Sequence, residues 1–421
     1  MRATSSAQQA VADALDAVER WNAQLACFIE VDGRGVNDAA RASDERRRDG
    51  RGIGPLDGIP FGVKANIACT GLEWNAGLRA RAGIRATEDA WVVHRLRSLG
   101  AIPLGATNMA EGAIGATTDN PFFGVCRNPV DPERSAGGSS GGSACAVAAG
   151  IVPFALGTDT LGSVRIPAAY CGVAAWKPSR GTIENQGVVP LCSDLDTVGI
   201  FARSASQVLR IADTLGLLEQ RGQVAMPTVV VLEAMLLRQI DLEVRRGFEM
   251  SLERLRDLGY QIRIDRRELP DLGRLRRALL LRCEVEAAAH FASLLESNPS
   301  GFSPALRALL EFGYRADSER IALAEEEITA SVDRLAATFG DGELLVLPTS
   351  PHVACPVGSD GPVDAVDFTA WVNPFGGSAV SIPVRSKVSE PGRLPVGVQV
   401  VGPPGHDGSV LALAARLEEA P

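Results

Sequence analysis

Apolar and polar positions along the chain follow two periods, one helical and one typical of strands. An apolar stripe at helical spacing predicts an amphipathic helix over residues 5–21, with a serine near its start. The same helical pattern recurs over residues 89–99, 143–149, 203–215 and 242–258. Short apolar or β-branched runs predict strands over residues 101–105, 153–157, 228–232 and 261–264. This alternation predicts an α/β layered fold with a partly parallel central sheet.

The stretch 265–337 differs in character from the rest of the chain. It is rich in Arg, Leu, Glu and Ala, and its apolar positions keep a helical period with few strand signals. It therefore predicts a helical layer. For most of its residues we favour an outer covering of the sheet, and the alternative is a wall of the substrate pocket. Residues 350–362 and 388–394 are rich in Pro, Gly and Ser and predict loops. Neither a repeat nor a clear linker is visible, so residues 1–421 are expected to form a single domain.

Two glycine-flanked serine blocks carry the strongest chemical signal, at residues 137–143 and 157–165, with an apolar run between them. Glycine lets backbone N–H groups approach a ligand closely and adopts positive φ. A serine among such N–H groups can act as a nucleophile with donors beside it, which acyl transfer requires. Either block alone is more typical of a flexible loop, and a phosphate-binding loop would need a Gly-Lys-Ser/Thr ending that is not present.

A serine hydroxyl needs a base to take its proton. The chain has four histidines, none of them beside the serine blocks: His94, His290, His352 and His406. Its 42 basic residues include only three lysines: Lys64, Lys177 and Lys387. A desolvated lysine can become neutral and act as a base, which arginine cannot. Lys64 follows the apolar run 58–63, and burial there would lower its pKa. Lys177 is interpreted as structural.

These segments together resemble the amidase signature hydrolases. Residues 55–64 resemble the lysine segment of that family, residues 137–142 its cis-serine loop, and residues 157–167 its nucleophile segment. Further matches lie at residues 195–199, 202–204, 347–349 and 394–399. The resemblance runs from about residue 5 to the C-terminus and is strongest over a signature core of about 55–204. It implies a large mixed, partly parallel central β-sheet covered by helices on both faces.

The resemblance also implies catalytic roles. Ser163 would be the nucleophile, Ser139 on a cis peptide bond would relay the proton, and Lys64 would be the neutral base. The oxyanion hole would be formed by backbone N–H groups of Thr160, Leu161, Gly162 and Ser163. Gly138 and Arg165 are the candidate substrate-binding residues, although a structural salt bridge is the favoured interpretation of Arg165. Asp159 is expected to order its loop by accepting hydrogen bonds.

Two positions depart from the family pattern. Ala65 stands where the family usually has aspartate, and Leu161 stands where it usually has glycine. A Cβ at residue 161 restricts positive φ. The leucine side chain must also point toward the acyl pocket or into the adjacent core. The sequence-based expectation is a narrowed acyl site that favours small or slender substrates.

Composition narrows the classes of function. A net charge of −9 gives no electrostatic signature for nucleic acid. No apolar run reaches the roughly 18–20 residues needed to span a membrane, and the N-terminus lacks a secretory apolar segment. The eight cysteines are scattered without a CxxC pair or Cys/His cluster, so neither zinc nor another metal is expected. Buried reduced thiols and a cytoplasmic location are the default expectations.

The sequence thus predicts an amidohydrolase that needs no cofactor. It would cleave a small carboxamide to a carboxylate and ammonia or an amine, through an acyl-enzyme on Ser163. The expected partner is the small-molecule amide; a homodimer is left open. The alternative is the A subunit of a glutamyl-tRNA amidotransferase, against which stand the short chain, its acidity, Ala65 and Leu161. A catalytically idle scaffold is the least favoured class.

Overall fold

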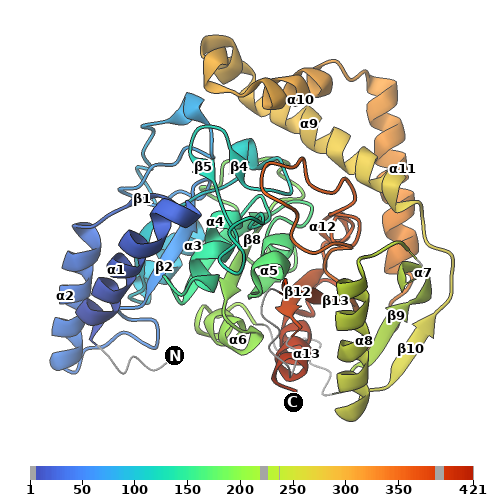
Figure 1. Ribbon diagram of the computed structural model, residues 1–421, viewed down its shortest axis with the longest axis horizontal. Coiled ribbons are helices and arrows are strands. Elements are labelled where there is room, and N and C mark those ends of the chain that lie inside the picture. Colours follow the sequence, from blue (N-terminus) through green and yellow to red (C-terminus); the bar gives the residue numbers. More distant parts are fainter. Residues whose placement is uncertain (1–5, 219–225, 237, 385–392, 421) are drawn as a thin grey trace.

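An eleven-stranded mixed sheet runs through the computed structural model, which describes residues 6–218, 226–236, 238–384 and 393–420 (Figure 1). From edge to edge its strands are β1 (Phe28–Val31), β3 (Ile102–Thr107), β2 (Pro60–Lys64), β6 (Phe154–Asp159), β8 (Thr197–Ala202), β7 (Ala174–Lys177), β12 (Ser378–Pro383), β13 (Gly397–Gly402), β11 (Glu343–Pro348), β9 (Thr228–Leu232) and β10 (Ile262–Asp265). Strands β3, β2 and β6 are mutually parallel, as are β11, β9 and β10. The other neighbours are antiparallel, so the predicted mixed, partly parallel sheet is confirmed.

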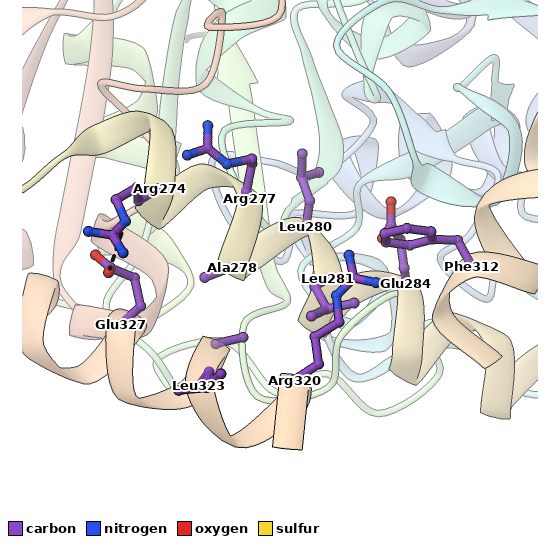
Figure 2. A pocket seen from close by; sticks show the side chains of 11 residues that line it. Arg274, Arg277, Ala278, Leu280, Leu281, Glu284, Phe312, Arg320, Leu323 and Glu327 are labelled. Atoms are coloured by element: carbon purple, nitrogen blue, oxygen red, sulfur yellow. Dashed lines mark ion pairs between the residues drawn. The ribbon is translucent and has the colours of Figure 1, made fainter. Parts of the chain in front are cut away.

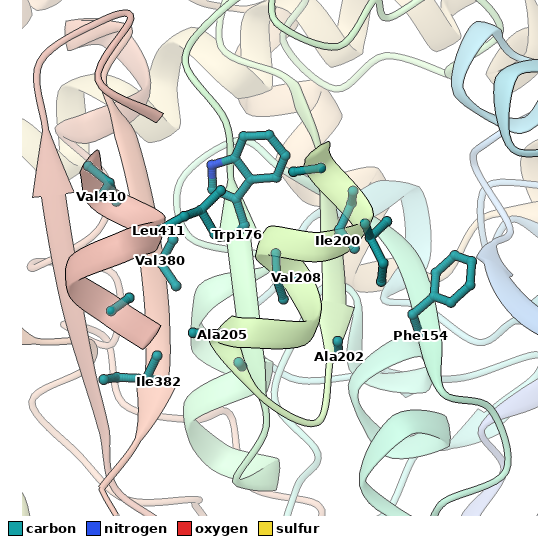
Figure 3. Packing of buried hydrophobic residues seen from close by; sticks show 14 of the residues in the cluster. Phe154, Trp176, Ile200, Ala202, Ala205, Val208, Val380, Ile382, Val410 and Leu411 are labelled. Atoms are coloured by element: carbon teal, nitrogen blue, oxygen red, sulfur yellow. The ribbon is translucent and has the colours of Figure 1, made fainter. Parts of the chain in front are cut away.

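Helices cover both faces of this sheet, because alternate strand residues point to opposite sides. On β6, Phe154 and Leu156 belong to one core cluster, whereas Ala155 between them belongs to another. Figure 3 shows the first cluster closed by α6 (Ala205–Thr214) and α13 (Asp407–Glu419). α3 (Trp91–Ser98) and α8 (Leu242–Asp257) also contribute to it. Each large apolar side chain buried in such a cluster stabilises the fold by about 1.5–3 kcal/mol.

The opposite face carries two groups of helices. One group comprises α1 (Ala7–Leu25), α2 (Gly35–Arg48), α4 (Gly141–Ala148) and α5 (Arg165–Cys171). The other group comprises α9 (Leu272–Ser297), α10 (Pro304–Tyr314), α11 (Ser318–Ala336) and the short α12 (Val372–Phe375). A further short helix, α7 (Glu233–Leu236), follows β9, and β4 (Asp119–Asn120) pairs with β5 (Gly124–Val125) apart from the main sheet. Within the described residues, no helix is long and apolar enough to cross a membrane.

The local predictions agree with this architecture apart from shifted ends. The predicted N-terminal helix is α1, and the Oγ of Ser6 caps it by accepting a hydrogen bond from the Gln9 N–H at 3.1 Å. The strand predicted at residues 153–157 extends to Asp159 and so carries Thr158. Residues 350–362 contain neither helix nor strand. Of the other predicted loop, residues 388–392 lie outside the described part of the chain.

The stretch 265–337 forms the helical layer α9–α11 after the short strand β10 ends at Asp265 (Figure 1). Its buried side chains share a cluster with β9 and β11, so the layer covers that half of the sheet. A hollow of about 480 Å³ lies between α9, α10 and α11 (Figure 2). At one end Arg274 pairs with Glu327, 3.8 Å apart, and elsewhere the Arg320 guanidinium lies 4.3 Å from the Phe312 ring centroid. None of the residues predicted for the catalytic site lines this hollow.

Candidate active site

Lys64 ends β2, a strand whose five residues are all buried. Its Nζ lies 2.8 Å from Ser139 Oγ, 2.8 Å from Thr158 Oγ1 and 3.4 Å from the Thr158 carbonyl oxygen. Burial lowers the pKa of Lys64 to about 7, and the charges of Asp196 and Asp159 oppose that shift. A substantial neutral fraction near pH 7 gives this amine the capacity to accept a proton.

Ser139 lies on a loop that contacts Ala110 and Thr117. The Gly138–Ser139 peptide bond is cis, and the carbonyl of Ser139 accepts a hydrogen bond from the Ala110 N–H at 3.1 Å. Gly138 packs so closely on Thr117 that a Cβ would lie 2.3 Å from the Thr117 carbonyl oxygen. This close approach requires glycine at residue 138, while contact of Gly138 with substrate stays a prediction.

Ser163 lies in the turn between β6 and α5. Its side chain is half-buried, whereas Ser139 and Ser140 are fully buried. The Ser163 carbonyl accepts a hydrogen bond from the Ser140 N–H at 3.2 Å, which joins the two serine blocks directly. The structure therefore brings the three predicted catalytic residues, Lys64, Ser139 and Ser163, into one region.

Residues 160–163, called here the oxyanion loop after their predicted role, lie in the turn between β6 and α5. Among the described residues, none accepts a hydrogen bond from the backbone N–H groups of Thr160, Leu161, Gly162 or Ser163. The Asp159 carboxylate orders the turn as expected, accepting hydrogen bonds from the N–H groups of Val164 (3.1 Å) and Arg165 (3.4 Å). Free N–H groups on an ordered turn are what stabilisation of an oxyanion requires.

The two departures from the family pattern are accommodated locally. Leu161 does not adopt positive φ, so its Cβ brings no backbone strain. Its side chain is 7% exposed and belongs to the core cluster of the helical layer. Gly162, by contrast, has φ +137°, and a Cβ there would lie 2.2 Å from Thr369 Oγ1. Ala65 is buried, and its backbone bonds to Thr107 and Ala76.

Arg165 is fully buried, and protein acceptors engage its whole guanidinium. Nε and one terminal nitrogen bind the Asp159 carboxylate at 3.0 and 2.8 Å. The remaining contacts are to the Thr369 carbonyl, Gln399 Oε1 and Asn373 Oδ1. Burial raises the pKa of Asp159, but the charge and hydrogen bonds of Arg165 outweigh it and hold that pKa at about 2. This geometry supports the structural salt bridge and leaves no free N–H for a substrate carboxylate.

Three side chains that form hydrogen bonds within the site were not predicted from the sequence to do so: Thr158, Thr160 and Asp196. Thr158 accepts hydrogen bonds from Lys64 and from Asn66 Nδ2 at 3.1 Å. The Thr160 hydroxyl donates to Asp196 Oδ1 at 2.5 Å. All three lie inside segments that match the family pattern, which was the only signal available for them.

Other candidates lie apart from this arrangement. Lys177 is fully buried and donates to the Pro178 carbonyl at 2.7 Å, in keeping with a structural role. Burial, reinforced by the charge of Arg165, lowers the pKa of Lys177 to about 7. In the part of the chain that the structure describes, no group of three His, Cys, Asp or Glu side chains is placed to hold a metal ion.

Comparison with known proteins identifies the family of this chain. The family profile described as Amidase matches residues 9–411. The chain belongs to the amidase family. It is a hydrolase that acts on amide C–N bonds. This amidase is 34% identical over 429 residues to the A subunit of the glutamyl-tRNA(Gln) amidotransferase of Treponema pallidum, covering 87% of this chain and 82% of the relative.

Solved structures of the amidase family also superpose on this chain. A crystal structure described as an amidase is 34% identical and superposes with a TM-score of 0.89, covering 98% of this chain and 96% of the other. The A subunit of the glutamyl-tRNA(Gln) amidotransferase of Thermotoga maritima is 26% identical, with a TM-score of 0.76 and coverage of 98% and 91%.

Proposed function

We propose that this amidase hydrolyses a small carboxamide on its own, through an acyl-enzyme on Ser163. The observation that carries the proposal is the 2.8 Å contact between Lys64 Nζ and Ser139 Oγ, next to a half-buried serine with free backbone N–H groups beside it. A base, a hydroxyl relay, a nucleophile and an oxyanion site are the parts that acyl transfer needs.

The proposed proton path uses Lys64 and Ser139, which are in hydrogen-bond contact, and Ser163 on the adjoining turn. Lys64 takes the proton of Ser139, and Ser139 takes the proton of Ser163 as Ser163 Oγ bonds to the substrate carbonyl carbon. The oxyanion loop binds the resulting negative oxygen. When the C–N bond breaks, the proton returns through Ser139 to the departing nitrogen, which leaves as ammonia or an amine. Water then attacks the ester carbon, and Ser163 recovers its proton as the carboxylate departs.

A second candidate is supported by the names of the sequence relatives, since matched chains at 30–34% identity are A subunits of glutamyl-tRNA(Gln) amidotransferases. Two observations favour the first candidate. The superposition is better on the amidase (TM-score 0.89) than on the Thermotoga protein (0.76). The net charge of −9 also gives no surface signature for RNA.

The decisive experiment uses the purified chain without any other protein. Ammonia release is measured on glutamine and on small aliphatic, dicarboxylic, ureido and aryl amides. Release from a small amide supports the independent hydrolase. Release from glutamine only after partner subunits are added supports the amidotransferase component. No release, combined with no covalent labelling of Ser163 by a fluorophosphonate, supports the idle scaffold.

We further propose that the enzyme is cytoplasmic, that it acts on small molecules, and that it needs neither nucleic acid nor a membrane. All eight cysteines are free thiols, and seven of them are buried, which suits a reducing compartment. Whether the enzyme forms a homodimer is tested by light scattering, which measures the molar mass of the purified protein in solution. Cell fractionation tests the location.

A further inference from the structure

Asp196 presents a buried carboxylate to the oxyanion loop from the start of β8. The residue is 5% exposed. Its Oδ1 accepts the Thr160 hydroxyl at 2.5 Å, and its Oδ2 accepts the N–H groups of Leu191 at 2.8 Å and Cys192 at 3.2 Å. All three donors are neutral, so they hold the carboxylate in place without cancelling its charge.

The sheet explains why Asp196 reaches Thr160. Strands β6 and β8 are antiparallel neighbours, and Asp159 lies opposite Thr197. The residue after β6 and the residue before β8 are therefore adjacent in space. Thr160 is tied by its side chain to the sheet, while its backbone N–H belongs to the oxyanion loop. A donor held this way needs little reorganisation when negative charge develops on a substrate oxygen.

Asp196 also lies close to the base, because Lys64 donates to Thr158 on β6, and Thr158 pairs with Val198, two residues beyond Asp196 on β8. Two carboxylates raise the pKa of Lys64 against the effect of burial, Asp196 more strongly than Asp159. Asp159 is bound by the Arg165 guanidinium, with Lys177 also acting on it. Asp196 has no such cation bonded to it among the described residues. Burial raises the pKa of Asp196 to about 6, against the hydrogen bond from Thr160 and the charge of Lys64.

We propose that Asp196 is a positioning residue with two effects: it fixes Thr160 at the start of the oxyanion loop, and its charge sets how readily Lys64 holds a proton. The kinetic part of this inference rests on the proposed function. The electrostatic part concerns only the folded protein. The two effects separate in variants. Asp196→Asn removes the charge and keeps a hydrogen-bonding amide opposite the Thr160 hydroxyl, which can donate or accept. Thr160→Val removes the tether and keeps the charge.

The first measurement is direct titration of Lys64 by NMR. The chain has only three lysines, so protein labelled at lysine Cε gives a spectrum of few signals, and Lys64→Arg assigns the one that belongs to Lys64. Asp196→Asn is expected to lower the midpoint of the Lys64 signal by about one pH unit. Thr160→Val is expected to leave it in place. An unchanged midpoint in Asp196→Asn overturns the electrostatic part.

A measurement on the wild-type protein covers the case in which Asp196→Asn does not fold. The Lys64 signal should show a second, smaller inflection near pH 6, where Asp196 ionises. A single inflection overturns the coupling. Neither NMR result depends on any amide being hydrolysed, so failure of the proposed function is seen separately, as absence of ammonia release from the wild type.

The second measurement is the pH profile of kcat/KM on an amide that the wild type hydrolyses. Thr160→Val should lower kcat/KM roughly tenfold or more at every pH, with the rising limb unmoved, and Thr160→Ser should restore most of it. Asp196→Asn should move the rising limb to lower pH. Wild-type kcat/KM in Thr160→Val overturns the positioning role, as does an equal loss in Thr160→Ser.

Discussion

Lys64 Nζ lies 2.8 Å from Ser139 Oγ, although 75 residues separate the two in the sequence. Both side chains are fully buried. Among the described residues, no carboxylate lies within salt-bridge distance of the amine. Burial therefore outweighs the more distant charges of Asp196 and Asp159 and lowers the pKa of Lys64 to about 7. The neutral form of Lys64 is therefore available to accept a proton from the Ser139 hydroxyl.

Ser163→Ala should reduce ammonia release by about 10³-fold or more, because the acyl group has no oxygen to bond to. Labelling by a fluorophosphonate should be lost in parallel. Ser143→Ala is the matched control, since its hydroxyl donates to the Leu156 carbonyl at 2.8 Å and serves the fold. The control should cost about 1 kcal/mol of stability and keep its activity. Full activity in Ser163→Ala would show that another residue is the nucleophile.

Lys64→Arg should be nearly as damaging as Lys64→Ala, since arginine keeps the charge but supplies no neutral amine. In the wild type, kcat/KM should rise as pH increases through about 7, where Lys64 loses its proton. A stopped assay of ammonia between pH 5.5 and 9 measures the activities of the two variants and the pH profile of the wild type. Substantial activity in the arginine variant would mean that Lys64 acts by its charge.

Lys64→Met should raise stability while abolishing activity. Below pH 7 the wild-type lysine is charged in both states, and the native state bears the full cost of burying it. Between pH 7 and 10.5 only the unfolded state holds the proton, so wild-type stability rises with pH relative to the variant. The advantage of the variant should therefore shrink by roughly 3 kcal/mol between pH 7 and 9.5. Urea unfolding measures it, and a difference that stays constant across this range would contradict the lowered pKa.

Arg165→Met should destabilise the protein by about 3–5 kcal/mol, because it leaves the Asp159 carboxylate buried and unpaired. The cost should decrease in acid as Asp159 becomes protonated. Arg165→Met combined with Asp159→Asn should recover much of the loss. If that double variant is active, its preference between amides with and without a carboxylate should match the wild type. A selective rise in KM for carboxylate-bearing amides would instead support substrate binding by Arg165.

Leu161→Ala should cost about 2–5 kcal/mol, as expected for truncating a buried leucine, and Leu161→Gly somewhat more. The order of preference among small and bulky amides should stay close to that of the wild type. Thermal unfolding and a substrate panel test both points. Wild-type stability with a widened substrate range would restore the expectation that Leu161 narrows the acyl site.

The sequence alone determined the parts that depend on local chemistry. Apolar periodicity placed α1 and α8 because amphipathic helices carry their own pattern, and a run of β-branched residues placed β9. The glycine blocks and the scarcity of lysine indicated serine chemistry with a lysine base, and the family resemblance assigned the roles to Ser139, Ser163 and Lys64. Strand β2 was not predicted, because Pro60 and Gly62 belong to residue types that are depleted in strands and leave only two large apolar side chains in it.

Only the tertiary structure decided which side chains meet. The order of the sheet sets β6 between β2 and β8, which brings Lys64, Thr158 and Asp196 to one place. Besides the nearby Asp159, Arg165 binds three acceptors more than 200 residues away, in Thr369, Asn373 and Gln399, and these contacts occupy its remaining N–H groups. The direction of the Leu161 side chain was open for the same reason. Contacts over such separations follow from strand order and packing, which no local pattern encodes.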